Sequence, residues 1–229
     1  RYTWTNTINV NKDFANGHSL NAVAGMEMFQ GKWYTSNFTG YDLNSDMMQS
    51  PAGIGDKSGS SLFPPSIGGG RTMSNLMSFF AQASYSIANK YNFSASLRHD
   101  TSSKFYEDNA SATFWSVGAS WLISSESWFD NAKWLNQLKL RASYGTTGNQ
   151  DGVSDFGTFD GYYNSSYNGE SGYSHGQLGN SELRWETSAQ TNVGLDVSVL
   201  DSRVNVTFDF YNIKTKDLYM SKNLSLIHI

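Results

Sequence analysis

The chain has 229 residues, of which 15% are aromatic and only 16% are charged, against about 25% charged residues in typical soluble domains. Its mean hydropathy of -0.47 excludes a helical membrane protein, and its net charge of -4 offers no basic surface for nucleic acid. Cysteine is absent, which excludes disulfide frameworks and thiolate metal sites, and the four histidines have no metal-ligand spacing.

The first predicted element is a half-buried strand over residues 2–14, because its even positions are mostly apolar and its odd positions are polar. Asn16-Gly17 is a dipeptide favoured in tight hairpin turns, and residues 20–28 resume the alternation. These two runs predict a β-hairpin. Periodicity then disappears between about Trp33 and Met73, where Gly, Ser, Pro and Asn accumulate, so this stretch is predicted to be a long loop.

Six further strands are predicted from the same alternation of apolar and polar residues. A short turn is expected at residues 88–90, a second long loop at about 148–183, and another tight turn at residues 200–202. The strand runs cover residues 77–87, 91–99, 115–123, 138–144, 185–199 and 204–210.

The seven connections between these eight strands run short, long, short, medium, medium, long, short. Short periplasmic turns that alternate with longer extracellular loops are typical of an antiparallel transmembrane β-barrel. The predicted fold class is therefore all-β: an antiparallel transmembrane β-barrel segment of about eight strands, with short periplasmic turns and long extracellular loops. A secreted β-sandwich or adhesin module that binds glycans through Tyr-rich loops is the alternative, although sandwich strands are usually shorter.

Four stretches of the chain carry a resemblance to a known family: SFFAQASYSIANKYNFSASLRHDTSSKF (78–105), FWSVGASWLISSESWF (114–129), WLNQLKLRASYGTTGNQ (134–150) and LGNSELRWETSAQTNVGLDVSVLDSRVNVTFDFYNIKTKDLYM (178–220). These stretches resemble the barrel of SusC/RagA-type TonB-dependent transporters, the glycan and peptide importers of Bacteroidetes outer membranes. One departure is that the family usually has Pro after the Phe at position 114, where this chain has Trp115.

This resemblance implies a barrel of about 22 strands with an N-terminal plug and a TonB box, neither of which this sequence contains. It also implies import of an oligosaccharide, or less readily a peptide, with TonB and a SusD-like lipoprotein as partners and no enzymatic step. Residues 1–223 are assigned to the barrel domain. The last six residues, LSLIHI (224–229), resemble a translated sequencing adapter, and the alternative is a genuine strand end.

The candidate binding residues lie in the second long loop. Aromatic rings in a polar loop can stack on sugars or bury against a protein partner, and packing between loops is the simpler alternative. The four candidates are Tyr162, Tyr163, Tyr167 and Tyr173. The acidic loop residues Asp151, Asp155 and Asp160 are interpreted as solvated turn residues, so no catalytic, metal or cofactor site is predicted.

Two other groups of side chains are assigned to the wall of the barrel. Amphipathic rings near strand ends predict a girdle at the lipid interface; they are Trp4, Trp33, Tyr34, Trp115, Trp121, Trp128 and Trp185. Charged residues on the polar positions of the strands are predicted to face the lumen or the plug, where they could form ion pairs; they are Arg98, Asp100, Lys139, Arg141, Asp196, Arg203 and Asp209.

Overall fold

The structure is a computed structural model that describes residues 1–41, 66–129 and 134–220. The expectation for the final six residues lies outside this described part. Within it, no helix is long and apolar enough to cross a membrane.

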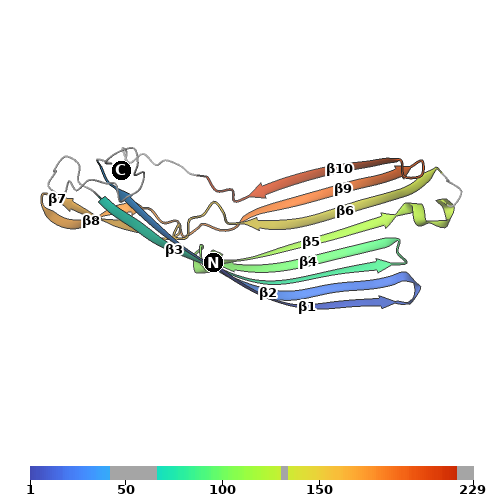
Figure 1. The fold of residues 1–229 in the computed structure, drawn as a ribbon, viewed down its shortest axis with the longest axis horizontal. Coiled ribbons are helices and arrows are strands. Elements are labelled where there is room, and N and C mark those ends of the chain that lie inside the picture. The colour runs from blue at the N-terminus through green and yellow to red at the C-terminus, as the bar shows by residue number, and fades with distance from the viewer. Residues whose placement is uncertain (42–65, 130–133, 221–229) are drawn as a thin grey trace, which may run out of the picture.

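Eight strands form one antiparallel sheet in the order β1-β2-β3-β4-β5-β6-β9-β10, and β7 and β8 form a separate hairpin (Figure 1). Short 3-10 turns occur at Ala15–Gly17, Glu107–Asn109, Ile123–Ser125 and Ser127–Phe129. The strands are β1 (Tyr2–Phe14), β2 (His18–Thr39), β3 (Ser66–Ile87), β4 (Tyr91–Ser102), β5 (Ser111–Leu122), β6 (Leu135–Asn149), β7 (Gly161–Tyr167), β8 (Glu170–Gln177), β9 (Glu186–Val199) and β10 (Val204–Lys216).

The strand register aligns the apolar positions of neighbouring strands on one face of the sheet, as the alternation predicted. One row across five strands contains Phe93, Ala119, Ala142, Val193 and Phe210, each opposite the next. Phe93, Val193 and Phe210 are nevertheless 42% to 60% exposed. The apolar face is thus continuous and uncovered by the described residues, as expected of a surface that faces lipid.

The opposite face is polar over the same strands. The corresponding row contains Ser94, Gly118, Ser143, Asn192 and Tyr211. A β-sandwich needs a second sheet packed on the apolar face, and the described residues supply no such sheet. The single two-faced wall therefore supports the barrel and excludes the sandwich alternative for this part of the chain.

The short connections lie at one end of the sheet, which we call the turn end, and the long ones at the other, the loop end (Figure 1). Positive φ values occur at Asn16 and Gly17, at Ala88 and Asn89, and at Leu200 to Ser202, as tight hairpin turns require. The amide of Asn89 donates to the Gly17 carbonyl across 3.2 Å, which joins two neighbouring turns. This arrangement confirms the predicted alternation of connection lengths.

The first predicted loop was wrong over parts of its length. Residues 31–39 of β2 and 66–74 of β3 continue as paired strands beyond the wall, and among the described residues they pair only with each other. We call this pair of segments the projecting hairpin. Most of its residues are exposed, so no face must be apolar, and the alternation that would reveal a strand is absent.

The second predicted loop also contains regular structure. β7 and β8 pair around a turn at Asn168 and Gly169, whose φ values are 51° and 84°. Both faces of this hairpin are largely exposed, so again no period-2 pattern of hydrophobic residues was required. An Asn-Gly turn is the signal in the sequence that could have predicted it.

Candidate functional site at the loop end

A small hydrophobic core lies at the loop end of the wall. Phe105, Phe114, Val153 and Trp185 are 4% to 7% exposed, and they are the buried hydrophobic residues of the described chain. The Trp185 ring lies 5.3 Å from the ring of Phe105 and 5.7 Å from that of Phe114, measured between centroids. We call this set the loop core.

Trp185 was expected to lie at the lipid interface, but the structure buries it in the loop core. Its side chain is enclosed by the loop core, and its Nε1 donates to the Ala110 carbonyl across 3.1 Å. An aromatic ring in the girdle must expose a face to lipid, whereas only 6% of Trp185 is exposed. The position just before a strand suggested a membrane interface, but the long connections fold over this ring.

Polar contacts tie the β4–β5 connection to the chain that follows β6. Lys104 Nζ donates to the Val153 carbonyl across 3.0 Å and lies 4.0 Å from Asp155. Asn109 Nδ2 donates to the Ser181 carbonyl across 3.3 Å. Asp155 thus contributes an ion pair to these packed connections, which together with the loop core we call the loop-end layer. With only 12% of its side chain exposed, Asp155 is not the solvated turn residue that the sequence suggested.

Tyr219 closes the layer from the C-terminal side. The Glu186 amide donates to the Tyr219 hydroxyl across 3.0 Å, and this hydroxyl lies 2.7 Å from the Arg184 carbonyl and 3.1 Å from that of Asn149. Partial burial raises the pKa of Tyr219, so the hydroxyl stays protonated and available as a donor. All four stretches that resemble the SusC/RagA barrel therefore meet at this layer: through Phe105, Phe114, Asn149 and the pair Trp185 and Tyr219.

The β7–β8 hairpin is attached to this layer at its base. Gln177 Nε2 donates to the carbonyls of Phe156 and Phe159 across 2.9 and 3.2 Å. The Gly179 amide donates to Asp160 Oδ1 across 2.8 Å. These bonds give the hairpin a fixed base, while its strands extend away from the wall (Figure 1).

The four candidate tyrosines lie on this hairpin and are all exposed: Tyr162 by 64%, Tyr163 by 55%, Tyr167 by 88% and Tyr173 by 80%. They do not form one cluster. Tyr162 is paired with His175, and Asn164 with Tyr173, so Tyr162, Tyr173 and His175 share one face, which we call the three-ring face. Tyr163 and Tyr167 lie on the other.

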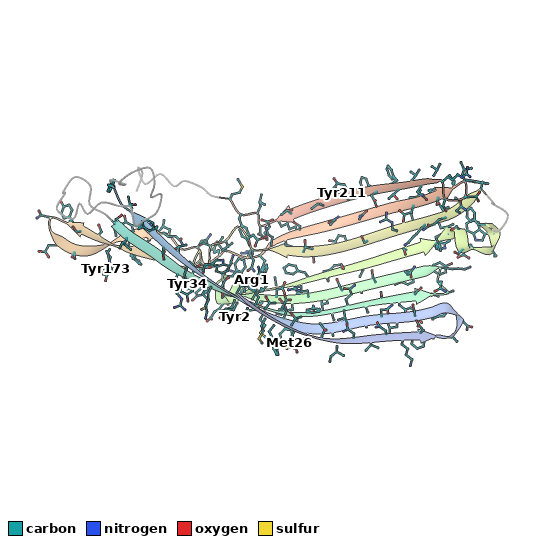
Figure 2. The ribbon with its side chains drawn as sticks, in the orientation of Figure 1. Arg1, Tyr2, Met26, Tyr34, Tyr173 and Tyr211 are labelled. Atoms are coloured by element: carbon teal, nitrogen blue, oxygen red, sulfur yellow. The ribbon has the colours of Figure 1, made fainter. Side chains whose placement is uncertain are left out.

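Tyr162 and His175 also contact each other, with ring centroids 4.9 Å apart in an edge-on arrangement. Figure 2 shows Tyr173 on the hairpin and Tyr34 on the projecting hairpin, both beyond the loop end of the wall. The exposure of the four tyrosines does not support packing between loops within the described structure. His175 was not among the predicted residues, because its proximity to Tyr162 depends on strand pairing.

Five of the expected interface aromatics lie on strands, and they divide between the wall and the projecting hairpin. Trp115 and Trp121 lie on the apolar face, where Trp115 packs 5.4 Å from the Tyr144 ring and Trp121 is opposite Tyr91. Trp4 lies on this face too, opposite Met28. These three remain predicted interface residues.

Trp33 and Tyr34 lie on the projecting hairpin, three to four positions past the last β2 residue that pairs with β1. The guanidinium of Arg71 is stacked over the Tyr34 ring at 5.5 Å. Their place beyond the wall makes Trp33 and Tyr34 weaker candidates for the girdle.

Two arginine-centred networks lie on the polar face. Arg98 bonds Asp100 across 2.8 Å and Glu27 across 3.4 Å, and Ser78 accepts a further bond. The second network joins Arg141 to Asp196 across 2.9 Å and to Asp209 across 3.0 Å. Most of the charges assigned to the lumen therefore pair with one another, as the sequence suggested.

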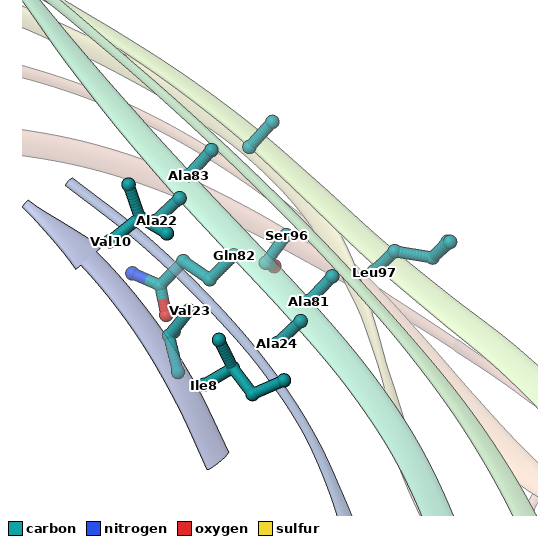
Figure 3. Close-up of a pocket in the computed structure, with 11 residues that line it drawn as sticks. Ile8, Val10, Ala22, Val23, Ala24, Ala81, Gln82, Ala83, Ser96 and Leu97 are labelled. Carbon is teal, nitrogen blue, oxygen red and sulfur yellow. The ribbon is translucent and has the colours of Figure 1, made fainter. Parts of the chain in front are cut away.

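The apolar face carries a shallow hollow of about 430 Å³ where small side chains meet (Figure 3). Alanines of three neighbouring strands form its floor, with Ile8 and Leu97 on either side, and Gln82 and Ser96 are its only polar side chains. This composition suits lipid chains and provides no chemistry. Nor does any group of three His, Cys, Asp or Glu residues in the described ranges have a metal-binding arrangement.

The two-faced antiparallel wall and the segregation of short and long connections define the class of protein: part of a β-barrel of an outer membrane. The family described as TonB dependent receptor-like, beta-barrel matches residues 1–225, and the chain belongs to this family. Its members are receptors and transporters, which agrees with the expectation that the protein is not an enzyme.

Individual relatives identify the SusC/RagA type. The chain is 35% identical over 216 residues to a TonB-dependent receptor of Formosa agariphila, covering 93% of this chain and 20% of the relative. It is 36% identical over 157 residues to the TonB-dependent receptor SusC of Bacteroides thetaiotaomicron, covering 66% of this chain and 16% of SusC. The structure of the RagAB peptide transporter matches with a TM-score of 0.82 and 25% identity, covering 98% of this chain and 24% of that chain.

These matches confirm the resemblance, the all-β antiparallel fold and the location in the outer membrane of Gram-negative bacteria. The chain spans between 16% and 24% of the length of these relatives. It is therefore part of a SusC/RagA-type receptor.

Proposed function

We propose that the intact protein imports an oligosaccharide, in preference to a peptide, across the outer membrane. Import is driven by TonB, and a SusD-like lipoprotein covers the loop end. The observation that supports this proposal most strongly is the combination of a lipid-facing wall with an exposed aromatic hairpin fixed at its loop end. The named relative RagAB is a peptide transporter, so the tests below include both classes of ligand.

The three-ring face is the proposed ligand surface. Tyr162, Tyr173 and His175 present rings on one side of a two-stranded ribbon whose base is held by Gln177. Tyrosine combines a large apolar ring with a polar tip and few rotatable bonds, so it can cover a sugar face and bond its hydroxyls at a low entropic cost. The other face of the β7–β8 hairpin, which carries Tyr163 and Tyr167, is the proposed contact surface for the SusD-like lipoprotein.

Uptake by cells tests the transport proposal. Cells that express the full-length receptor with its lipoprotein should accumulate members of a panel of fluorescently labelled linear oligosaccharides, and labelled tryptic peptides should enter less. Uptake should stop when the gene for TonB is deleted or the proton gradient is dissipated. Accumulation that persists without TonB would contradict energy-coupled import, and a preference for peptides would overturn the proposed substrate class.

Paired substitutions on the hairpin test the assignment of the two faces. In the full-length receptor, Tyr162→Ala with Tyr173→Ala should weaken binding of the imported oligosaccharide about tenfold or more. The scale is taken from aromatic stacking on nucleic-acid bases, where each ring contributes about 1–3 kcal/mol. The matched control, Tyr163→Ala with Tyr167→Ala, should leave oligosaccharide binding unchanged but reduce co-purification of the lipoprotein. The reverse pattern would exchange the two roles.

A further inference from the structure

The β5–β6 connection carries an interaction at the turn end that the proposed transport function does not use. The carboxylate of Glu126 lies 2.7 Å from the hydroxyl of Tyr91 and 3.2 Å from Trp121 Nε1. Lys90 Nζ donates to the same carboxylate across 3.2 Å. Three side chains from the neighbouring hairpin and the end of β5 therefore converge on one residue of this connection, an arrangement that we call the Glu126 clip.

The clip determines the side of the wall on which the connection lies. Tyr91 and Trp121 are directly opposite each other in β4 and β5, on the apolar face, and their rings stack at 6.1 Å. A tyrosine hydroxyl is the outermost atom of its side chain, and Glu126 accepts from it. The segment that carries Glu126 therefore folds outward, over the lipid-facing rim, rather than across the lumen.

The composition of this segment, residues 123–129, suits the depth of the lipid headgroups. Glu126 is paired with Lys90, so the clip adds no net charge, and three serines supply hydroxyl groups. Trp128 is 64% exposed and its ring centroid lies 4.5 Å from that of Phe129. An exposed Trp ring beside polar residues is typical of the headgroup region.

We infer that residues 123–129 form an interfacial element that inserts Trp128 into the headgroup layer of the periplasmic leaflet, with the Glu126 clip as the device that holds it there. The element is continuous with the apolar face of the wall, which the family places in the outer membrane. Its occupant is phospholipid. The sequence alone suggested an interface position for Trp128, and the clip supplies the geometry that fixes its side of the wall.

Site-directed spin labelling of the full-length receptor in vesicles of phosphatidylethanolamine and phosphatidylglycerol tests this inference. A nitroxide at Trp128→Cys is compared with one at Phe93→Cys, on the apolar face, and one at Ser166→Cys, on the loop-end hairpin. The collision rate of the nitroxide with oxygen, divided by its collision rate with a water-soluble nickel chelate, rises with depth in the bilayer. We expect the ratio at position 128 to be several-fold above that at 166 and below that at 93.

Two results would overturn the inference. A ratio at position 128 equal to that at 166 would place the segment in water. Low accessibility to both reagents would mean that another part of the protein covers Trp128. Adding Glu126→Ala to the Trp128→Cys receptor tests the clip itself: the ratio should fall toward the aqueous value, and an unchanged ratio would show that the clip does not hold the segment.

Discussion

The wall and the loop-end layer keep their apolar side chains away from water in opposite ways. In the wall, apolar side chains such as Phe93 and Phe210 point outward and remain 48% and 60% exposed in the chain. At the loop end, Phe114 and Trp185 are enclosed as in a water-soluble domain. The difference follows from the solvent: the wall needs lipid to cover its apolar face, whereas the layer outside the membrane must build its own core.

The largest effect should come from removing a ring of the loop core. Phe114→Ala should destabilise the loop-end layer by about 3–5 kcal/mol, the usual cost of truncating a buried phenylalanine. The Phe114 ring also packs on Gly148, where a Cβ would collide with it. The measurement is the rate of protease cleavage in residues 150–185 of the full-length receptor in detergent.

The matched control for this prediction is Phe93→Ala, which removes the same ring from the apolar face. It should leave cleavage of the loop-end layer at the rate of the unmodified receptor. If both variants accelerated cleavage equally, the layer would not be an independent core, and the contrast between the two regions would fail.

The contrast also explains which elements could be predicted from the sequence. The eight wall strands were predictable because lipid on one face and water on the other impose a period of two, and Asn16-Gly17 marked its turn. The projecting hairpin and the β7–β8 hairpin were missed because exposure on both faces imposes no pattern. The loop core was missed because Phe105 and Trp185 meet only through long-range contacts between aperiodic segments.

A smaller effect is expected from the turn of the β7–β8 hairpin. Gly169 has φ of 84°, and no atom lies within 4 Å of the place that a Cβ would take, so Gly169→Ala should cost about 1–2 kcal/mol through backbone strain alone. Gly172→Ala, on the same hairpin but without a positive φ, is the control and should cost much less. Hydrogen exchange of the β7 and β8 amides measures the local opening.

If Gly169→Ala left the exchange of these amides unchanged, the hairpin would not depend on its turn. Faster exchange confined to β7 and β8 would sharpen the comparison, because it would show that the hairpin opens independently of the wall and of the loop core.

The Tyr219 hydroxyl should contribute about 1 kcal/mol to the loop-end layer, the net value of a typical hydrogen bond. Tyr219→Phe keeps the ring and removes the bonds to Glu186 and Arg184. Because burial raises the pKa of Tyr219 above its ordinary value of 10.0, this contribution is fully present below pH 10.0 and is lost as the pH rises through the higher folded-state value.

Protease cleavage of residues 150–185, measured as a function of pH, checks the Tyr219 prediction. The unmodified layer should become more susceptible only above pH 10.0, whereas Tyr219→Phe should be slightly more susceptible at neutral pH and lack this alkaline component. An identical alkaline increase in both proteins would assign it to another group.

The smallest effect is expected at the turn end, where the Glu126 clip holds one short segment to the rim. The hydrogen bond from Tyr91, followed by those from Lys90 and Trp121, lowers the pKa of Glu126 below its ordinary value of 4.5. A lowered pKa means that the clip contributes fully above pH 4.5 and is lost as the pH falls through the folded-state value. A nitroxide at Trp128→Cys should therefore become more mobile in strong acid.

Glu126→Gln separates the charge of the clip from its shape. The amide cannot form an ion pair with Lys90, and one of its two terminal atoms is a donor, whereas both carboxylate oxygens of Glu126 accept hydrogen bonds. The label at position 128 should therefore be mobile already at neutral pH and insensitive to acid. The strand pairing of Tyr91 with Trp121 should persist in both proteins, because backbone bonds maintain it. If acid mobilised the label equally in the Gln variant, a titrating group other than Glu126 would release the segment. The turn end would then depend on more than one contact, as the loop end does.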